Sequence, residues 1–239
     1  LGVYGYSAAT LISAQNADNI ERVEAVTPAM VAAQIEAVVA ERRPAALKTG
    51  ALLTAETVKA VAGAIKRLNL PGPVVDPVLI ASSGTPLLDQ RGETALCHEL
   101  IPLASAVTPN IPEAERLSGI AIDGPEAMRA AAAAIHRMGS RSVVIKGGHP
   151  FSGARPDLRQ MANSAADVFY DGKEFIVLEG ERVEGASLHG SGCIFSAAIA
   201  GYLARGSSLI DAIRDAKKFI TRAMRNRVQL GNGAQIFFR

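Results

Sequence analysis

Short apolar runs alternate with longer segments of helical periodicity between residues 7 and 146. A short apolar run bounded by turn residues is typical of a buried strand, whereas apolar residues three and four apart indicate one face of a helix. Regular alternation of the two is typical of parallel β-α-β units. The predicted strands are Ser7–Ser13, Ala45–Lys48, Pro73–Asp76, Ser105–Thr108 and Ser142–Lys146.

Capping residues mark the starts of the helices predicted between these strands. Thr27 precedes Pro28, and a Thr followed by Pro at the first helical position is a strong helix-start signal. Thr54 likewise precedes a helix whose first turn contains Glu56, where a negative charge suits the helix dipole. The predicted helices are Pro28–Arg42, Thr54–Asn69, Gln90–Leu103, Ile111–Ser118 and Gly124–Met138.

The pattern changes after residue 166, where turns such as Asp171-Gly172 separate short strands. Such turns predict hairpins, so these strands extend the sheet with an antiparallel edge. We therefore expect an α/β protein, a three-layer α/β/α sandwich with a mostly parallel central sheet, formed by one domain over residues 1–239. The elements predicted here are strands Asp167–Tyr170, Phe175–Leu178 and Glu181–Glu184 and helices Gly192–Ala204 and Leu209–Val228.

Charge and composition exclude several classes of protein. The net charge is +2 without runs of like charge, which disfavours a nucleic-acid-binding protein. Cys97 and Cys193 are too few for a disulfide framework, and no C-x-x-C pattern suggests zinc. The longest uncharged apolar run, Ser191–Ala204, is short of the ~20 residues of a membrane-spanning helix. We expect a cytoplasmic protein without nucleic-acid or membrane partners.

Polar residues stand at the ends of four successive predicted strands. In open α/β sheets, ligands bind beyond the carboxyl ends of the strands. A turn with a capping residue explains any one of these ends, but four in succession predict a binding site. The four ends are Lys48-Thr49-Gly50, Asp76-Pro77-Val78, Thr108-Pro109-Asn110 with Glu113, and Lys146-Gly147-Gly148-His149.

A further motif, His189-Gly190-Ser191-Gly192-Cys193, precedes the apolar helix. Its glycines let the backbone approach a ligand, and the first helical turn offers free N–H groups to an anion such as phosphate. The same field would lower the pKa of Cys193. A plain Gly-Ser-Gly turn with a small buried Cys explains the spacing equally well. P-loop, G-x-G-x-x-G and G-x-S-x-G motifs do not occur.

In these motifs the sequence resembles the hydroxymethylpyrimidine and phosphomethylpyrimidine kinases of thiamine biosynthesis, in the ribokinase-like superfamily. The resemblance runs from Leu1 to about Ala223, and in this family the last motif ends in Cys where sugar kinases carry Asp. The matching stretches are Ser13-Ala14-Gln15-Asn16, Lys48-Thr49-Gly50, Val75-Asp76-Pro77-Val78, Val107-Thr108-Pro109-Asn110-Ile111-Pro112-Glu113-Ala114-Glu115, Val144-Ile145-Lys146-Gly147-Gly148-His149 and His189-Gly190-Ser191-Gly192-Cys193.

The resemblance implies ATP-dependent phosphorylation of a pyrimidine hydroxymethyl group, and then of the resulting monophosphate, with Mg²⁺. In this comparison Gln15 would hydrogen-bond the aminopyrimidine edge, while Ala51 and Val78 would pack on the ring. Members of the family are commonly homo-oligomers, so we expect one here.

The resemblance also implies where the phosphates and the metal bind. Asn110 and Glu113 match an N-x-x-E pattern that holds Mg²⁺ through water, and Asp76 would join that water network. Gly190, Ser191 and Gly192 would form the anion hole, with Cys193 as the proton acceptor. The strand-end residues Lys146, Gly148 and Thr108 would contact the nucleotide.

The sequence departs from the family pattern in several places. A lid lysine and an acid are replaced by Ser82 and Thr85, Ser187-Leu188 replaces Asn-Thr, and Gly231-Asn232-Gly233 replaces Gly-His-Gly. Family members also begin with a strand, a Gly-rich turn and a helix that would precede Leu1. We expect either that this segment lies outside the sequence or that the protein is a shortened relative.

Three alternatives stay open. A pyridoxal kinase acts on a similar ring with a hydroxymethyl group beside it, and the sequence separates it poorly from a pyrimidine kinase. A non-catalytic pyrimidine-binding relative would keep the pocket and lose turnover. A Cys-nucleophile enzyme would use Cys193 with His189, although no third orienting group is evident.

Overall fold

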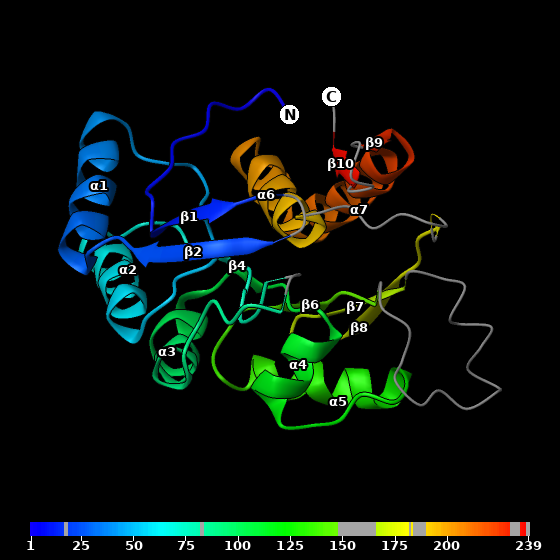
Figure 1. The fold of residues 1–239 in the computed structure, drawn as a ribbon. Coiled ribbons are helices and arrows are strands. Elements are labelled where there is room, and N and C mark those ends of the chain that lie inside the picture. The colour runs from blue at the N-terminus through cyan, green and yellow to red at the C-terminus, as the bar shows by residue number, and fades with distance from the viewer. Residues whose placement is uncertain are drawn as a thin grey trace.

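A six-stranded sheet in the order β3-β4-β5-β6-β7-β8 organises the described part of the chain (Figure 1). The structure is a computed structural model that describes residues 1–16, 19–81, 84–147, 166–181, 183, 190–229 and 235–237. Strands β3 to β6 are parallel, and β7 and β8 are added antiparallel to them. The strands are β3 (Lys48–Thr49), β4 (Val74–Val75), β5 (Ala106–Val107), β6 (Val143–Ile145), β7 (Asp167–Tyr170) and β8 (Phe175–Leu178).

Helices cover both faces of this sheet, because successive side chains of each strand point to opposite faces. Val75 packs in the hydrophobic cluster formed with α2, α4 and α5, whereas its neighbour Val74 packs in the cluster formed with α6 and α7. Val143 and Val144 are divided in the same way. The predicted α/β/α sandwich with an antiparallel edge is therefore confirmed.

The helices begin where the sequence places capping residues. The side chain of Thr27 accepts a hydrogen bond from the Met30 N–H, and that of Thr54 accepts one from the Thr57 N–H. After α3 the chain continues in a π-helical turn, Leu96–Leu100, and a 3₁₀ turn, Ile101–Leu103. The helices are α1 (Pro28–Glu41), α2 (Ala55–Arg67), α3 (Gln90–Ala95), α4 (Ile111–Ser118), α5 (Pro125–His136), α6 (Ser191–Ala204) and α7 (Leu209–Arg225).

A two-stranded hairpin separate from the main sheet corrects the prediction near the N-terminus. Its strands are β1 (Leu11–Gln15) and β2 (Ile20–Ala25), so the strand predicted over Ser7–Ser13 begins later, and β2 was not predicted. In β2 only Ile20 and Val23 are turned inward, because the register shifts opposite Ala14 and Gln15. That shift removes the period-two alternation that identifies a strand.

The C-terminal helix also ends earlier than predicted. The helix expected to reach Val228 stops at Arg225, and β9 (Arg227–Gln229) pairs antiparallel with β10 (Gln235–Phe237). Of the strand predicted over Glu181–Glu184, residues 182 and 184 lie outside the described part of the chain. No helix in the described part of the chain is long and apolar enough to cross a membrane.

Candidate active site

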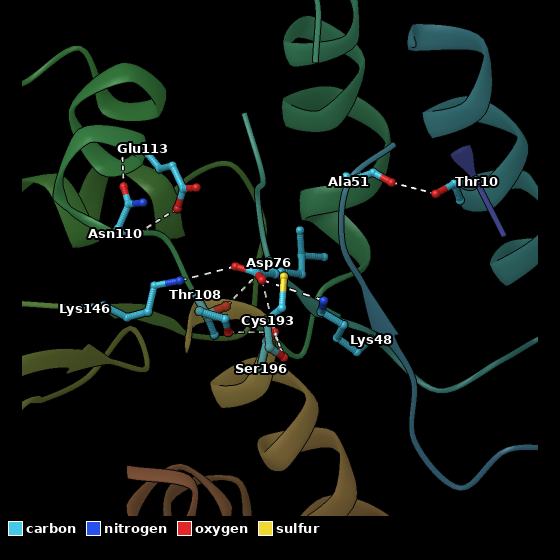
Figure 2. Close-up of polar contacts among 12 residues, drawn as sticks. Thr10, Lys48, Ala51, Asp76, Thr108, Asn110, Glu113, Lys146, Cys193 and Ser196 are labelled. Atoms are coloured by element: carbon cyan, nitrogen blue, oxygen red, sulfur yellow. Dashed lines mark hydrogen bonds and ion pairs between the residues drawn. The ribbon is translucent and has the colours of Figure 1, made fainter. Parts of the chain in front are cut away.

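Asp76, the residue that follows β4, is the centre of a charged cluster at the carboxyl edge of the sheet. Its side chain is almost fully buried, with 3% exposure. Lys146 Nζ lies 3.3 Å from Oδ1, Lys48 Nζ lies 3.7 Å from Oδ2, and the Ser196 hydroxyl lies 3.2 Å from Oδ2. Figure 2 shows the two lysines reaching Asp76 from opposite sides. Two ammonium groups therefore share one carboxylate, which leaves excess positive charge for an anionic ligand.

The parallel register brings these residues together. Lys48 lies in β3, beside β4, and the Asp76 N–H continues the ladder by donating to the Thr49 carbonyl at 3.0 Å. Lys146 follows β6, and its N–H donates to the Pro109 carbonyl at 2.9 Å. Because carboxyl ends of parallel strands lie at one edge, residues distant in sequence converge on Asp76.

Glycines make room for both ammonium groups. A Cβ at Gly50 would lie 2.9 Å from Lys48 Nζ, and a Cβ at Gly192 would lie 3.0 Å from Lys146 Nζ. Gly192 belongs to the first turn of α6, which begins after Gly190 in the left-handed conformation (φ 74°) and contains no acidic residue. Lys146 thus lies beside a helix N-terminus, and both features favour an anion.

Cys193 corrects one prediction. It is exposed in the first turn of α6, and the pKa of its thiol is raised, chiefly by partial desolvation and further by the negative charge of Asp76, to which it hydrogen-bonds. Lys48 and Lys146 act in the opposite direction without reversing the shift. The prediction of a lowered pKa was therefore wrong, because the sequence did not show that Asp76 lies beside the sulfur.

Asn110 and Glu113 form the start of α4. The Asn110 side chain accepts from the Glu113 N–H, and the Glu113 carboxylate accepts from the Asn110 N–H, both at 2.8 Å, which is a capping box. Glu113 is 8% exposed, and its pKa is raised to about 7 by burial, with Asp76 adding to the rise and Lys146 opposing it. The described residues hold no group of three or more His, Cys, Asp or Glu arranged for a metal.

The remaining candidate residues lie on the same edge or on the hairpin. Thr108 is buried, and its hydroxyl donates to the Val75 carbonyl at 3.4 Å, whereas Gly148 falls outside the described residues. Val78 is half-buried two residues after Asp76.

The β1–β2 hairpin is tied to the loop that follows Lys48. Ala51 is half-buried there, and its carbonyl accepts a hydrogen bond from the Thr10 hydroxyl at 2.7 Å (Figure 2). Gln15 is exposed at the irregular end of β1, so it lies on the hairpin and not on the main sheet. The predicted contact of Gln15 with a heterocycle stays a prediction.

Two members of the cluster were not assigned from the sequence. Lys48 was noted as a strand-end residue without a role, although Lys at a strand end beside Gly50 resembles Lys146 beside Gly147. Ser196, fully buried, donates to Asp76 and is three residues after Cys193. That spacing places both on one face of α6, which is the signal that could have found Ser196.

The fold and the site define a small-molecule kinase, and solved structures support this class. The chain resembles the pyridoxal kinase of Bacillus subtilis in an ADP complex, with a TM-score of 0.86, 34% identity, and coverage of 98% of this chain and 86% of that one. It also resembles the phosphomethylpyrimidine kinase of Clostridium difficile, with a TM-score of 0.78, 34% identity, and coverage of 93% and 87%.

Sequence comparisons identify the family. A phosphomethylpyrimidine kinase family model matches residues 1–237, and the chain belongs to that family. It is 41% identical over 236 residues to the hydroxymethylpyrimidine/phosphomethylpyrimidine kinase of Rhizobium meliloti, covering 98% of this chain and 85% of the relative. It is 42% identical over 233 residues to the thiamine biosynthesis bifunctional protein of Geobacter sulfurreducens, covering 98% of this chain but 46% of that longer protein.

Proposed function

We propose that this chain transfers the γ-phosphoryl group of ATP to the hydroxymethyl group of 4-amino-5-hydroxymethyl-2-methylpyrimidine, and then to the resulting monophosphate. The observation that carries the proposal is the convergence of Lys48, Lys146 and the first turn of α6 on Asp76. Phosphoryl transfer depends mainly on alignment and charge neutralisation, and this cluster supplies positive charge at one point. Its relatives in Rhizobium meliloti and other bacteria carry the name of this activity.

Each residue of the cluster has a distinct task in this proposal. Lys146 and the N–H groups of Gly190–Cys193 bind phosphate oxygens of ATP. Lys48, which lies toward the substrate end, binds the phosphate of the monophosphate substrate, and Asp76 holds both ammonium groups in place. Cys193 accepts the proton of the attacking hydroxyl as a thiolate, the form that Lys48 and Lys146 favour and that desolvation and Asp76 disfavour.

Mg²⁺ fits the oxygen groups of this edge. The ion binds few protein oxygens, keeps several waters and is completed by phosphates. Glu113 is a buried carboxyl with a pKa near 7, raised in part by Asp76, and a nearby cation would return it to its charged form. We place Mg²⁺ at Asn110, Glu113 and Asp76 through water, where it would neutralise phosphate charge. Contacts of Gln15, Ala51 and Val78 with the pyrimidine, contacts of Thr108 and Gly148 with ATP, a homo-oligomeric assembly and a cytoplasmic location belong to the same proposal.

The decisive experiment measures ATP consumption with the hydroxymethylpyrimidine and its monophosphate, for the wild type and Cys193→Ala. The variant should lose about 10²–10⁴-fold in kcat and still bind ATP, because Ala keeps the backbone N–H groups of the anion hole. Cys97→Ala is the matched control, since Cys97 lies in the π-helical turn outside the cluster and should keep full activity. Full activity of Cys193→Ala would show that the thiol is a packing group.

Pyridoxal phosphorylation is the second candidate function. The likeness to the Bacillus subtilis pyridoxal kinase, at a TM-score of 0.86, favours it. Comparing kcat/KM for the pyrimidine and for pyridoxal at saturating ATP separates the two activities. A pyridoxal value equal to or above the pyrimidine value would reassign the substrate, and turnover of neither would favour the non-catalytic alternative.

A further inference from the structure

A buried ion pair lies outside the Asp76 cluster. Asp167, the first residue of β7, and Lys217, on α7, are 6% and 8% exposed, and Lys217 Nζ lies 2.7 Å from Asp167 Oδ2. Desolvation of two charges offsets most of their attraction, so a buried pair is weak evidence for a stabilising role. A role other than stabilisation therefore accounts better for a buried ion pair at this position.

The second oxygen of Asp167 supplies that explanation. Oδ1 accepts a hydrogen bond from the Gly147 N–H at 3.0 Å, and Gly147 directly follows Lys146. A Cβ at Gly147 would lie 1.9 Å from the Ala166 carbonyl oxygen, so the two backbones are in direct contact at this point. The Asp167 carboxylate thus joins α7 to the peptide that carries Lys146.

Lys146 is held from the other side as well. Its N–H donates to the Pro109 carbonyl at 2.9 Å, which extends the parallel pairing of β5 with β6. With Gly147 held by Asp167, the peptides on both sides of the Lys146 Cα are fixed. Its flexible side chain therefore starts from a defined point when it reaches Asp76 and the first turn of α6.

We propose that Asp167 and Lys217 are positioning residues that hold Lys146 in place for the phosphates of ATP. Lys217 orients the Asp167 carboxylate, and the carboxylate fixes the Gly147 peptide. Neither side chain contacts the reacting atoms. This inference rests on the proposed function, because it assigns ATP phosphates to Lys146.

The test compares Lys217→Met with Lys217→Arg, and uses Ile213→Val as a matched control. Ile213 is fully buried on the same helix, so Ile213→Val lowers stability without touching Asp167. We measure the dissociation constant of ATP by calorimetry, the KM of each substrate, and the melting temperature. A small displacement of a binding group strongly lowers its contribution to binding. Lys217→Met should therefore raise the Kd and KM of ATP about tenfold or more, while the pyrimidine KM changes less than about twofold.

The other variants separate positioning from general damage. Lys217→Arg should restore most of the ATP affinity, and Ile213→Val should lower the melting temperature with ATP affinity unchanged. If Lys217→Met does not fold, the double substitution Asp167→Leu/Lys217→Met, which removes both charges of the pair, replaces it with the same expected rise in Kd. The rise follows because a leucine side chain offers no oxygen to the Gly147 N–H.

Three results would overturn the inference. The first is an unchanged ATP Kd in a folded Lys217→Met or double variant. The second is an equal rise in the KM of ATP and of the pyrimidine. The third is a rise in the ATP Kd for Ile213→Val that is as large as the rise for Lys217→Met. If the wild type binds ATP and turns over substrate, and the variants bind ATP equally well, only this inference is contradicted. A wild-type protein that does neither contradicts the proposed function and the inference together.

Discussion

Glu113 gives the sharpest prediction, because its carboxyl group is both structural and proposed to act at the metal. It closes the capping box of α4 by accepting the Asn110 N–H. It is also 8% exposed, and burial raises its pKa to about 7. Glu113→Gln keeps an oxygen that accepts the same N–H, so the capping box survives while the titrating group is removed.

The magnitude follows from the pKa. A rise from the usual 4.5 to about 7, at ~1.4 kcal/mol per pH unit, corresponds to about 3 kcal/mol of unfolding free energy. Between these values the folded protein keeps the proton that the unfolded chain has released. The contribution of Glu113 is therefore lost as the pH rises from about 4.5 to about 7, and it is level above that range.

Urea unfolding at pH 5 and pH 8, without nucleotide, tests this reasoning. We expect the wild type and Glu113→Gln to differ little at pH 5, and the variant to be more stable by up to about 3 kcal/mol at pH 8. Turnover of the same variant should fall strongly and recover in part at higher Mg²⁺, since one oxygen group of the metal site has lost its charge.

The matched control is Glu126→Gln, which removes an acid from the first turn of α5 where the side chain is 87% exposed. It should cost only about 0.3–1 kcal/mol, with little difference between the two pH values. An equal stability difference for Glu113→Gln at both pH values would refute the electrostatic argument. Unchanged turnover at limiting Mg²⁺ would remove Glu113 from the metal site.

Two further substitutions test the substrate and nucleotide ends of the site. Gln15→Leu should raise the KM of the pyrimidine, because it removes one hydrogen bond worth ~0.5–1.5 kcal/mol, and should leave the KM of ATP unchanged. Equal effects on both KM values would mean general damage to the hairpin. Gly192→Ala places a Cβ 3.0 Å from Lys146 Nζ, so the ATP KM should rise although the melting temperature does not fall, because Ala favours a helix by up to about 1 kcal/mol. An unchanged ATP KM would show that Lys146 tolerates the shift.

The main sheet could be predicted because its information is local. Val74–Val75 and Val143–Ile145 are short apolar runs bounded by turns, and Thr27 and Thr54 mark helix starts by their own chemistry. The β2 strand could not be predicted, because its register shift replaces alternation with two inward residues three apart. The pattern of apolar residues does not predict a strand that is defined by its pairing with another segment and not by its burial.

The site divides along the same line. Placement of Asp76 and Lys146 at one sheet edge follows from their positions at the carboxyl ends of predicted parallel strands. The direction of the shift in the Cys193 pKa could not be predicted, because it depends on a contact with Asp76, which lies in a distant segment of the sequence. The pairing of Asp167 with Lys217 is equally non-local, since no motif joins β7 to α7. Electrostatic contacts between segments that are distant in sequence depend on the three-dimensional fold.

The two lysines on Asp76 should have separable roles, and their surroundings say which. Lys146 lies beside Gly192 and the first turn of α6, where we place the ATP phosphates. Lys48 precedes the loop of Ala51, which the Thr10 hydroxyl ties to the β1–β2 hairpin at the substrate end. Lys146→Met should therefore raise the KM of ATP, whereas Lys48→Met should chiefly raise the KM of the monophosphate substrate, which brings a second phosphate to that end. Each variant leaves Asp76 one ammonium partner, so both should fold, and equal effects of the two substitutions on both substrates would mean that the cluster acts as one undivided anion site.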